Sequence, residues 1–410
     1  MRSRILLVLA ILAIVAYLPT LWQPLLEDDY PNIGQAHEYG TSVVTNSVFS
    51  VRATQFLAAD AIYRIFGVYA PAYYTFLILL HVLNTWLVYA LGAWRLIGHT
   101  VSVWAAAFFS VYEGHQEGIM WFSGATEPLL FVFAAGALAC WIEFLRTARW
   151  TWYVAALAAF VGGLYSKESA FIVVPLLALP IVFERTFLRR AVWLLPFAAL
   201  ATIAVAHILH TRTYSFRFND GSFSLHAPFW LTWPSNFARL FWFWGLLAVV
   251  TLLLWKPSKY LVVLAIGVLW AGLSLIPYSF LTYSTRIPSR QLYLASAGVA
   301  LIVGCALAAL AERWWRRRAS VVAAVCALML IHNVGYLWTR KRAQFLARAA
   351  PTEQLIALAR STRGPIYVRC FPRPPIVADF AVRLTTGRDD LIWDAAQSGK
   401  AAATFCYTEK

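Results

Sequence analysis

The stretch RSRILLVLAILAIVAYLPTLWQPLLEDDYP, residues 2–31, joins a long apolar run to three consecutive acidic residues. Arg2 and Arg4 precede the run, as in a secretory signal sequence, but no convincing small-residue cleavage site comes before the acids. The run is long enough to cross a bilayer, because a spanning helix needs about 20 apolar residues. We therefore predict a retained first transmembrane helix, with the acids placed where this helix reaches the membrane surface.

The composition of the whole chain agrees with a membrane protein. Of its 410 residues, 61% are hydrophobic and only 13% are charged, whereas a soluble domain usually carries about 25% charged residues. The net charge of +15 would suggest nucleic-acid binding in a soluble protein. In a membrane protein it is better explained by basic cytoplasmic loops, so we predict no nucleic-acid partner.

Apolar runs recur along the chain and predict an all-α polytopic membrane protein with about 11 transmembrane helices. The runs cover residues 4–25, 72–94, 100–112, 127–145, 150–165, 169–184, 191–210, 237–255, 259–281, 291–311 and 319–338.

The loops between these runs alternate in character. One set is short and basic, for example around Arg146 and at 313–318, and the positive-inside rule places it in the cytoplasm. The other set holds nearly all of the unusual polar sequence and is predicted to face outside. We predict a cytoplasmic N-terminus and a periplasmic C-terminus in a bacterial inner membrane, although the basic residues 340–342 do not fit this pattern.

The composition changes near residue 339, which predicts two parts: a membrane domain over 1–338 and a small α/β extension over 339–410. Short β-like runs, PIYVRCF and TFCYTE, enclose a possible helix around 376–386. Cys370 and Cys406 are the two cysteines of this extension. They are candidates for a disulfide if the extension lies in an oxidising compartment.

The acids that follow the first run are the first candidate site. A carboxylate beside a bilayer is costly to desolvate and tends to be functional when it faces a cavity. Asp28 or Asp29 could act as a general base toward a hydroxyl, or help to hold a divalent metal ion. The alternative is an ordinary solvated loop.

A second polar stretch, VYEGHQEGIMWFSG at residues 111–124, contains His115 and Glu117. Its spacing matches no strong metal-binding motif, so we predict no metal site there. A polar turn covered by aromatic side chains is the more modest interpretation.

Cations occur in two further external loops. Lys167 and Glu168 lie in YSKES, and Arg286 and Arg290 lie in YSTRIPSRQLYLASAG. A lone lysine beside a membrane helix usually extends to the surface, but it can also bind a phosphate, and arginine can bind phosphate through two hydrogen bonds. The chain has no P-loop or GxGxxG motif, so these cations point to a lipid-borne phosphate rather than a soluble nucleotide.

Five short stretches resemble the GT-C type, polyprenyl-phosphate-dependent glycosyltransferases, and especially the protein O-mannosyltransferase clan. The likeness extends over most of residues 20–300, with short and degenerate motifs. Ala295 replaces an expected proline, Glu127 stands where aspartate is common, and the tail has no tetratricopeptide repeats. The stretches are EDDY, FGVYAPAYYTFLILLHVLNTWLVYAL with its H-x-x-N pair His81 and Asn84, EGHQEGIMWFSGATEPLL, SKESAFIVVPLL and SRQLYLASAG.

This resemblance implies a GT-C-like fold and an inverting transfer of a hexosyl or pentosyl group from a polyprenyl-phosphate sugar to an acceptor hydroxyl outside the cell membrane. The acceptor is a glycan, lipid or protein. Asp28 or Asp29 would be the base, and we favour Asp28. No cofactor is certain, and a divalent cation is left open. The residues implied to bind substrate are Lys167, Arg290, Arg286, Glu117, His115 and Glu168.

Two other functions remain as alternatives. A transporter or flippase of lipid-linked sugars would show charges near the bilayer midplane and internal repeats, whereas here the charges cluster at one surface. A structural membrane subunit that docks a partner through its tail would leave the external acids without a role.

Overall fold

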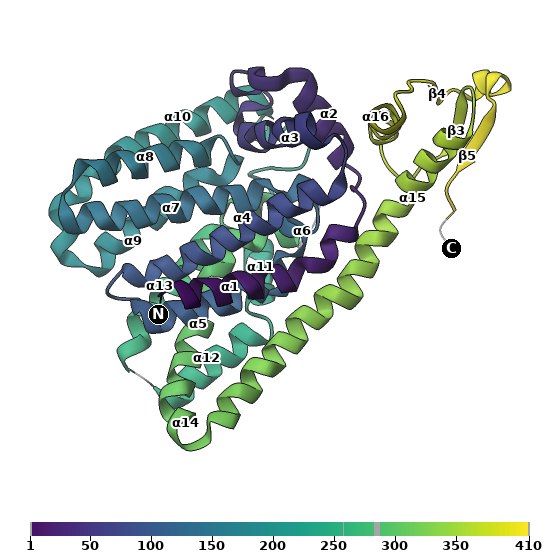
Figure 1. Ribbon diagram of the computed structural model, residues 1–410. Coiled ribbons are helices and arrows are strands. Elements are labelled where there is room, and N and C mark those ends of the chain that lie inside the picture. The colour runs from purple at the N-terminus through teal and green to yellow at the C-terminus, as the bar shows by residue number, and fades with distance from the viewer. Residues whose placement is uncertain (1, 257, 283–287, 409–410) are drawn as a thin grey trace.

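The protein is described by a computed structural model over residues 2–256, 258–282 and 288–408, without the side chains of residues 315–317. Figure 1 shows a bundle of helices with a small α/β tail that projects from one end. The helices are α1 (Arg2–Tyr17), α2 (Asp29–Tyr39), α3 (Ala53–Phe66), α4 (Ala70–Ala90), α5 (Gly98–Val111), α6 (Gln116–Ile119), α7 (Thr126–Thr147), α8 (Trp150–Leu164), α9 (Val173–Phe183), α10 (Leu195–Arg212), α11 (Phe229–Phe241), α12 (Trp244–Trp255), α13 (Leu261–Leu275), α14 (Tyr293–Tyr336), α15 (Arg342–Ser361) and α16 (Pro375–Thr386). The strands are β1 (Thr213–Tyr214), β2 (Arg217–Phe218), β3 (Ile366–Cys370), β4 (Leu391–Ile392) and β5 (Ala403–Cys406).

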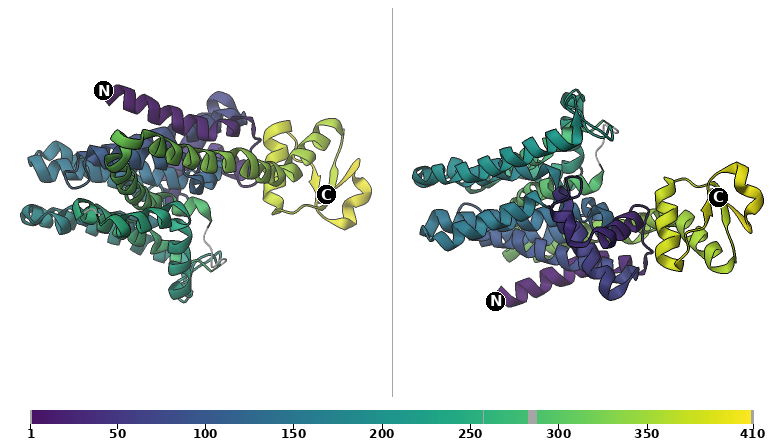
Figure 2. Two further views of the ribbon diagram at one scale, coloured as in Figure 1. Left: turned by 90° about the horizontal axis from the view of Figure 1, so that it is seen from below. Right: turned by 90° about the horizontal axis from the view of Figure 1, so that it is seen from above.

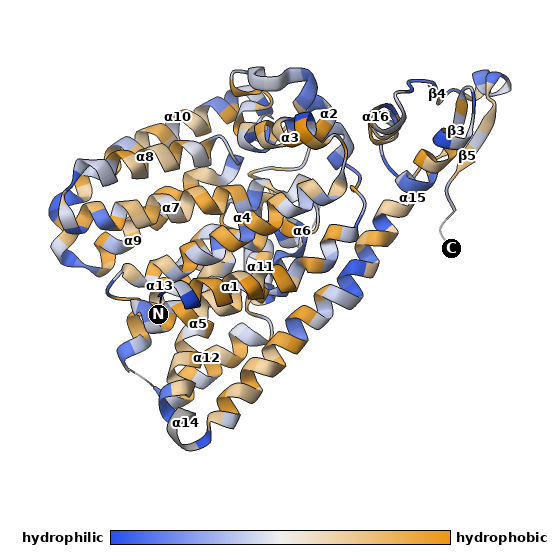
Figure 3. Cartoon of the chain, in the orientation of Figure 1, coloured by the Kyte–Doolittle hydropathy of each residue, from blue (hydrophilic) through white to orange (hydrophobic). Residues whose placement is uncertain are grey.

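The apolar helices confirm the all-α polytopic class (Figure 3). Within the described ranges, seven helices are long and apolar enough to cross a membrane, and the bent pair α11–α12 adds an eighth if it forms one span. The remaining three predicted runs form helices shorter than 18 residues: α5, α8 and the segment containing α9. The predicted number of about 11 is therefore reached only with helices that are short for a hydrocarbon layer about 30 Å thick.

The first half of α14 is the central helix of the bundle. Most of the span Ser289–Trp314 is buried, and glycines let its neighbours approach closely. A Cβ atom added at Gly298 would lie 2.3 Å from the Gly267 carbonyl oxygen of α13. One added at Gly304 would lie 2.7 Å from the Val101 carbonyl oxygen of α5. Small residues at such crossings allow backbones to pack directly against each other.

The H-x-x-N pair of α4 has a structural position in this core. The His81 Nδ1 atom lies 2.6 Å from the hydroxyl of Tyr293 on α14, and the Asn84 side-chain amide donates to the same hydroxyl at 3.1 Å. All three side chains are fully buried. Two of the stretches that resemble the glycosyltransferases therefore meet as a hydrogen-bonded link between α4 and α14.

A long helical segment connects the bundle to the tail. α14 contains a kink at Arg318, where φ is −150° and ψ is 64°, and the chain then runs back along the bundle. A π-helical turn, Leu337–Lys341, continues it into α15, so that residues 318–361 form one helix of 44 residues. The predicted division between 338 and 339 falls inside this helix, and it remains a prediction.

The tail is a small α/β unit. β3 lies between β4 and β5 in a three-stranded parallel sheet, with α16 between β3 and β4 in the chain. The two strands and the helix predicted from PIYVRCF, TFCYTE and residues 376–386 are confirmed. A separate core holds the unit together and consists of Leu355, Ala359, Ile366, Val368, Ala378, Val382 and Phe405.

A disulfide joins Cys370 at the end of β3 to Cys406 at the end of β5, across 36 residues of sequence. We expect its removal in a Cys370→Ser/Cys406→Ser variant to cost the tail about 2–4 kcal/mol, because the open loop gains entropy on unfolding. Hydrogen exchange of residues 366–406 in detergent would measure the loss. A reducing agent should loosen the wild-type tail and leave the double-serine variant unchanged. An equal response of both proteins would contradict a stabilising disulfide.

Candidate functional site

The polar loops meet at one end of the bundle, on the side from which the tail projects (Figure 2). They surround a cavity of about 740 Å³. Its wall takes residues from segments far apart in the chain: the stretch after α1, the turn before α7, the loop between α8 and α9, the β1–β2 hairpin, and the segment before α14. The sequence predicted that these loops share one face, and their common cavity agrees with that prediction.

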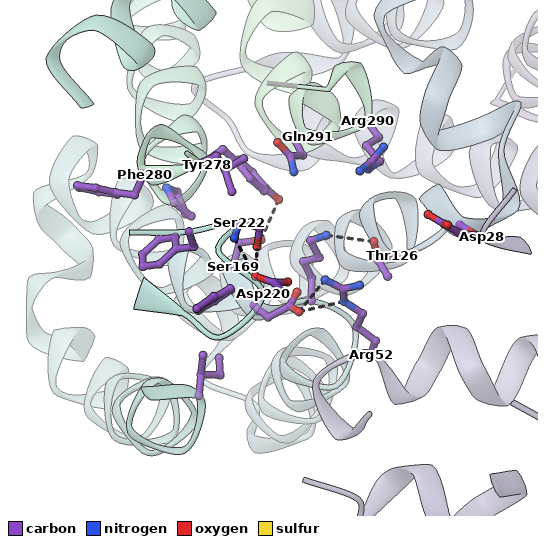
Figure 4. A pocket seen from close by; sticks show the side chains of 18 of the residues that line it. Asp28, Arg52, Thr126, Ser169, Asp220, Ser222, Tyr278, Phe280, Arg290 and Gln291 are labelled. Carbon is purple, nitrogen blue, oxygen red and sulfur yellow. Dashed lines mark hydrogen bonds and ion pairs between the residues drawn. The ribbon is translucent and has the colours of Figure 1, made fainter. Parts of the chain in front are cut away.

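Asp28 and Asp29 have different surroundings. Asp28 precedes α2 and faces the cavity, and its carboxylate makes no hydrogen bond or ion pair within the described residues (Figure 4). Asp29 is fully buried and accepts hydrogen bonds from the Leu26 amide at 2.9 Å, the Ser123 amide at 2.7 Å and the Ser123 hydroxyl at 2.6 Å. Asp29 therefore fastens the start of α2 to the turn at residues 122–124, and Asp28 is left open to a ligand.

The two carboxyl groups also differ in what controls their ionisation. Burial raises the pKa of Asp29 to about 7, although the hydrogen bonds from Ser123 and Leu26 oppose this shift. Burial and then the neighbouring Glu27 raise the pKa of Asp28, while nearby arginines lower it. A carboxyl with a raised pKa is a stronger base than an ordinary one, which suits proton transfer near neutral pH.

Glu27, the first of the three acids, is directed toward the tail. Its carboxylate accepts two hydrogen bonds from Arg348 of α15, at 3.1 and 2.8 Å, and forms a 2.6 Å ion pair with Arg373. Each of the three acids thus has its own surroundings: tail arginines for Glu27, the open cavity for Asp28, and a buried turn for Asp29.

Lys167 lies in the cavity wall between α8 and α9. Its ammonium is 3.4 Å from the Glu127 carboxylate and donates to the Thr126 hydroxyl at 3.4 Å. Burial lowers the pKa of Lys167, and Glu127 counteracts this effect. Glu127 itself is fully buried and accepts a 2.8 Å hydrogen bond from Tyr278. A buried carboxylate thus holds the lysine in place with its charge beside the cavity.

Glu168 does not present a free carboxylate. Arg52 donates to it at 2.9 Å and Arg212 at 2.6 Å, so two guanidinium groups share one acid (Figure 4 shows the ion pairs of Arg52). Arg52 also lines the cavity. This cluster therefore leaves an excess of positive charge next to Lys167.

Arg290 lies on the same side of the cavity as Asp28 (Figure 4). Its guanidinium lies over the Trp121 ring, 4.7 Å from the ring centre. The Arg348 guanidinium contacts the same ring, 4.5 Å from its centre. The Glu117 carboxylate is 3.8 Å from the Arg290 guanidinium and accepts from its backbone amide at 3.3 Å. Glu117 thus supports Arg290 and is not itself part of the cavity wall.

His115, also predicted to bind substrate, is not part of the cavity wall. His115 is fully buried in the bundle, with its Nε2 atom 2.6 Å from the Ser296 hydroxyl and its ring tilted against that of Tyr293. Helical packing buries His115 beneath α14, which the polar appearance of this turn did not reveal. Arg286 lies outside the described residues.

The other end of the cavity is mainly apolar, with Asp220 and Ser222 as its polar members (Figure 4). Phe280 and Tyr278 stand opposite Asp28 and Arg290 in Figure 4. Side chains of α10, of β2 and the loop after it, and of the segment after α13 complete this end: Val205, Ile208, Leu209, Phe218, Phe223, Ile276 and Leu281. The cavity therefore combines a charged half with a half suited to hydrocarbon.

The described residues do not provide a ligand set for a metal ion. No three His, Cys, Asp or Glu side chains in these ranges gather in a suitable way. Of the three acids after α1, Glu27 is paired with arginines and Asp29 is hydrogen-bonded, which leaves Asp28 alone. A divalent cation binds several oxygen ligands, so no step is assigned to one here.

Known proteins share this architecture. Residues 53–210 match the family described as dolichyl-phosphate-mannose-protein mannosyltransferase. The oligosaccharyltransferase of Archaeoglobus fulgidus in its apo form superposes with a TM-score of 0.53 at 11% identity, covering 97% of this chain and 65% of the other. ArnT from Cupriavidus metallidurans, solved bound to undecaprenyl phosphate, gives a TM-score of 0.50 at 15% identity, covering 97% and 89%. No curated protein sequence matches the chain.

These matches confirm the resemblance to the GT-C type. The chain has a GT-C fold, and the family match within it supports a membrane glycosyltransferase of this type. It spans less than two thirds of the length of the oligosaccharyltransferase, 64–65%.

Sequence reasoning missed several residues of the site. Four arginines of the site belong to no recognisable motif: Arg52, Arg212, Arg348 and Arg373. Trp121 is one of the aromatic residues of 111–124, which the sequence suggested only as a cover for a polar turn. Their roles arise from partners that are far away in the chain, such as Arg52 with Glu168, 116 residues apart. A single sequence carries no signal for such pairs.

Proposed function

We propose that the chain transfers a sugar from a polyprenyl-phosphate donor to an acceptor hydroxyl, with Asp28 as the general base. The observation that carries this proposal is one cavity with an unpaired carboxylate, neighbouring cations and an apolar end. A lipid-linked sugar phosphate has the matching parts: an anionic group between a polar sugar and a hydrocarbon chain.

The reaction is a single displacement at the anomeric carbon. Asp28 takes the proton of the acceptor hydroxyl while its oxygen forms a bond to the anomeric carbon. The bond from that carbon to the phosphate oxygen breaks, and its electron pair leaves with the polyprenyl phosphate. One displacement inverts the configuration, so we propose an inverting enzyme that transfers a hexosyl or pentosyl group.

The leaving phosphate gains negative charge during this step. We propose that Lys167 and Arg290, both in the cavity wall, stabilise this charge, because preorganised charges aimed at developing charge stabilise a transition state. Lys167 supplies a compact charge held by Glu127, and Arg290 supplies a guanidinium oriented by Trp121 and Glu117. Glu168 contributes indirectly, since it keeps Arg52 at the cavity wall.

The apolar end is proposed to receive the first isoprene units of the donor. The protein ArnT, which shares the fold, was solved with undecaprenyl phosphate, a lipid of this class. We propose further that the cavity faces the periplasm of a bacterial inner membrane, with the N-terminus in the cytoplasm, and that the acceptor is a glycan, lipid or protein. The oxidising periplasm would permit the disulfide of the tail.

The purified protein in lipid nanodiscs tests this proposal. It would be incubated with radiolabelled undecaprenyl-phosphate hexoses and pentoses, and the label would be followed into water-soluble products or an added acceptor. We expect one donor to be consumed. In a second assay, the protein is placed in sealed vesicles. A donor that crosses the membrane without being cleaved would indicate the transporter or flippase alternative. If the donor is neither cleaved nor transported, a structural subunit is the remaining function.

A further inference from the structure

The tail contacts α2 along one face of that helix. The Tyr30 hydroxyl donates to Glu353 at 3.2 Å, and the Arg383 guanidinium pairs with Glu38 at 2.5 Å. Between them, a Cβ atom added at Gly34 would lie only 2.2 Å from the ring of Phe380 on α16. Residues 30, 34 and 38 follow the helical repeat, so α2 presents a continuous surface to the tail (Figure 1).

Glu27, just before α2, makes a further buried contact with the tail. Its side chain is nearly inaccessible and is held by Arg348 through two hydrogen bonds and by Arg373 through an ion pair. The backbone at Glu27 has a φ of +34°, in the left-handed region that side chains disfavour. Such a conformation persists where surrounding contacts enforce it. The ion pairs with the arginines are contacts of this kind.

Asp28 is therefore fixed from both sides. The residue before it is clamped by the tail, and the residue after it is fastened to Ser123. We infer that the tail is a positioning element of the active site, and that Arg373, through Glu27, aims the Asp28 carboxylate at the acceptor. This inference rests on the function proposed above, because it assigns a purpose to the base named there.

Arg373 also contributes to the charge around Asp28. The groups that face Asp28 are Glu27, which raises its pKa, and Arg290, Arg348 and Arg373, which lower it; Asp28 in turn affects Asp29. Loss of the Arg373 charge removes one lowering influence and leaves Glu27 less neutralised. The pKa of Asp28 then rises, and a base must be deprotonated to act, so the acidic limb of the activity profile moves to higher pH.

The test compares three variants of the full-length protein in nanodiscs. Arg373→Ala removes the Arg373 half of the clamp, and Arg373→Lys keeps a charge for the ion pair with Glu27. Arg383→Ala is the matched control, because it removes another tail contact to α2, at Glu38, away from the acids. For Arg373→Ala we expect kcat to fall about tenfold or more, with little change in the KM for the donor, since small misplacements of catalytic groups are costly.

The pH profile separates positioning from a general loss of structure. We expect the acidic limb of kcat/KM to shift upward by up to about one pH unit in Arg373→Ala, to return toward wild type in Arg373→Lys, and to stay in place in Arg383→Ala. Equal losses in Arg373→Ala and Arg383→Ala, or a wild-type profile in Arg373→Ala, would overturn the inference while the transferase function stands. A wild-type protein that transfers no sugar would overturn the proposed function itself.

Discussion

Replacement of Asp28 by asparagine should nearly abolish sugar transfer and leave the protein folded. Asparagine has the same size but cannot take the proton from the hydroxyl of the acceptor substrate. General acid–base catalysis contributes about 10²- to 10⁴-fold to rates. Asp28 makes no hydrogen bond or ion pair within the described residues, so its amide should disturb no structure. The measurement is kcat for transfer from the radiolabelled donor, with donor binding by the same protein as the check on folding.

The neighbouring acid is the matched control for this experiment. In Asp29→Asn, an NH2 group replaces one of the two acceptor oxygens. Leu26 donates to one oxygen of the present carboxylate and Ser123 to the other, so the NH2 group must face a donor in either orientation. An unsatisfied buried group costs about 1–3 kcal/mol, so this variant should lose stability and keep more activity per folded molecule than Asp28→Asn. A fully folded but silent Asp29→Asn beside an active Asp28→Asn would reverse the two roles.

Removal of the Lys167 charge should produce the second large effect. Lys167→Met keeps the length and apolar stem of the side chain but withdraws the cation from the developing phosphate charge. Loss of one such group typically costs about 10²- to 10³-fold in kcat. We expect a loss of this order in transfer, together with weaker binding of the donor in an equilibrium assay with undecaprenyl phosphate.

The variant leaves Glu127 buried without its partner, which could unfold the protein for an unrelated reason. A double variant, Lys167→Met/Glu127→Gln, removes both charges and restores neutrality at this position. We expect it to recover stability and to remain inactive. Lys259 lies just before α13 and forms an exposed ion pair with Glu312 of α14. Lys259→Met breaks this pair and should have wild-type activity. Recovered activity in the double variant would refute a role for the lysine charge.

The sequence could predict the class of fold because membrane spans are encoded locally. Apolar length and the alternation of basic and polar loops are properties of short segments, so the bundle and the common face of the acids follow from them. The number of spans was harder to predict. α5 is apolar and short, and its burial against α14 depends on Gly304, whose partner lies about 200 residues away in the chain.

The site was less accessible to sequence reasoning. Asp28 and Lys167 were found because their residue types are unusual beside apolar runs, and both lie in the cavity wall. His115 has the same unusual type but is enclosed by the bundle. The pairing of Glu27 with Arg373 depends on how the tail folds back onto α2, and neither residue has a local pattern that reveals its partner.

The helix that carries the tail fixes both the distance of the tail from the bilayer and the direction in which the tail faces. Residues 318–361 form one rod of 44 residues, about 66 Å at 1.5 Å per residue, and this is about twice the thickness of a bilayer's hydrocarbon layer. One inserted residue would raise the tail by about 1.5 Å and turn it by about 100°. Seven inserted residues, close to two whole turns, would nearly restore its facing but raise it by about 10 Å. Any change in the length of this helix therefore changes both the height of the tail above the bilayer and the direction in which the tail faces. The chain has little freedom to gain or lose residues between the bilayer and the tail.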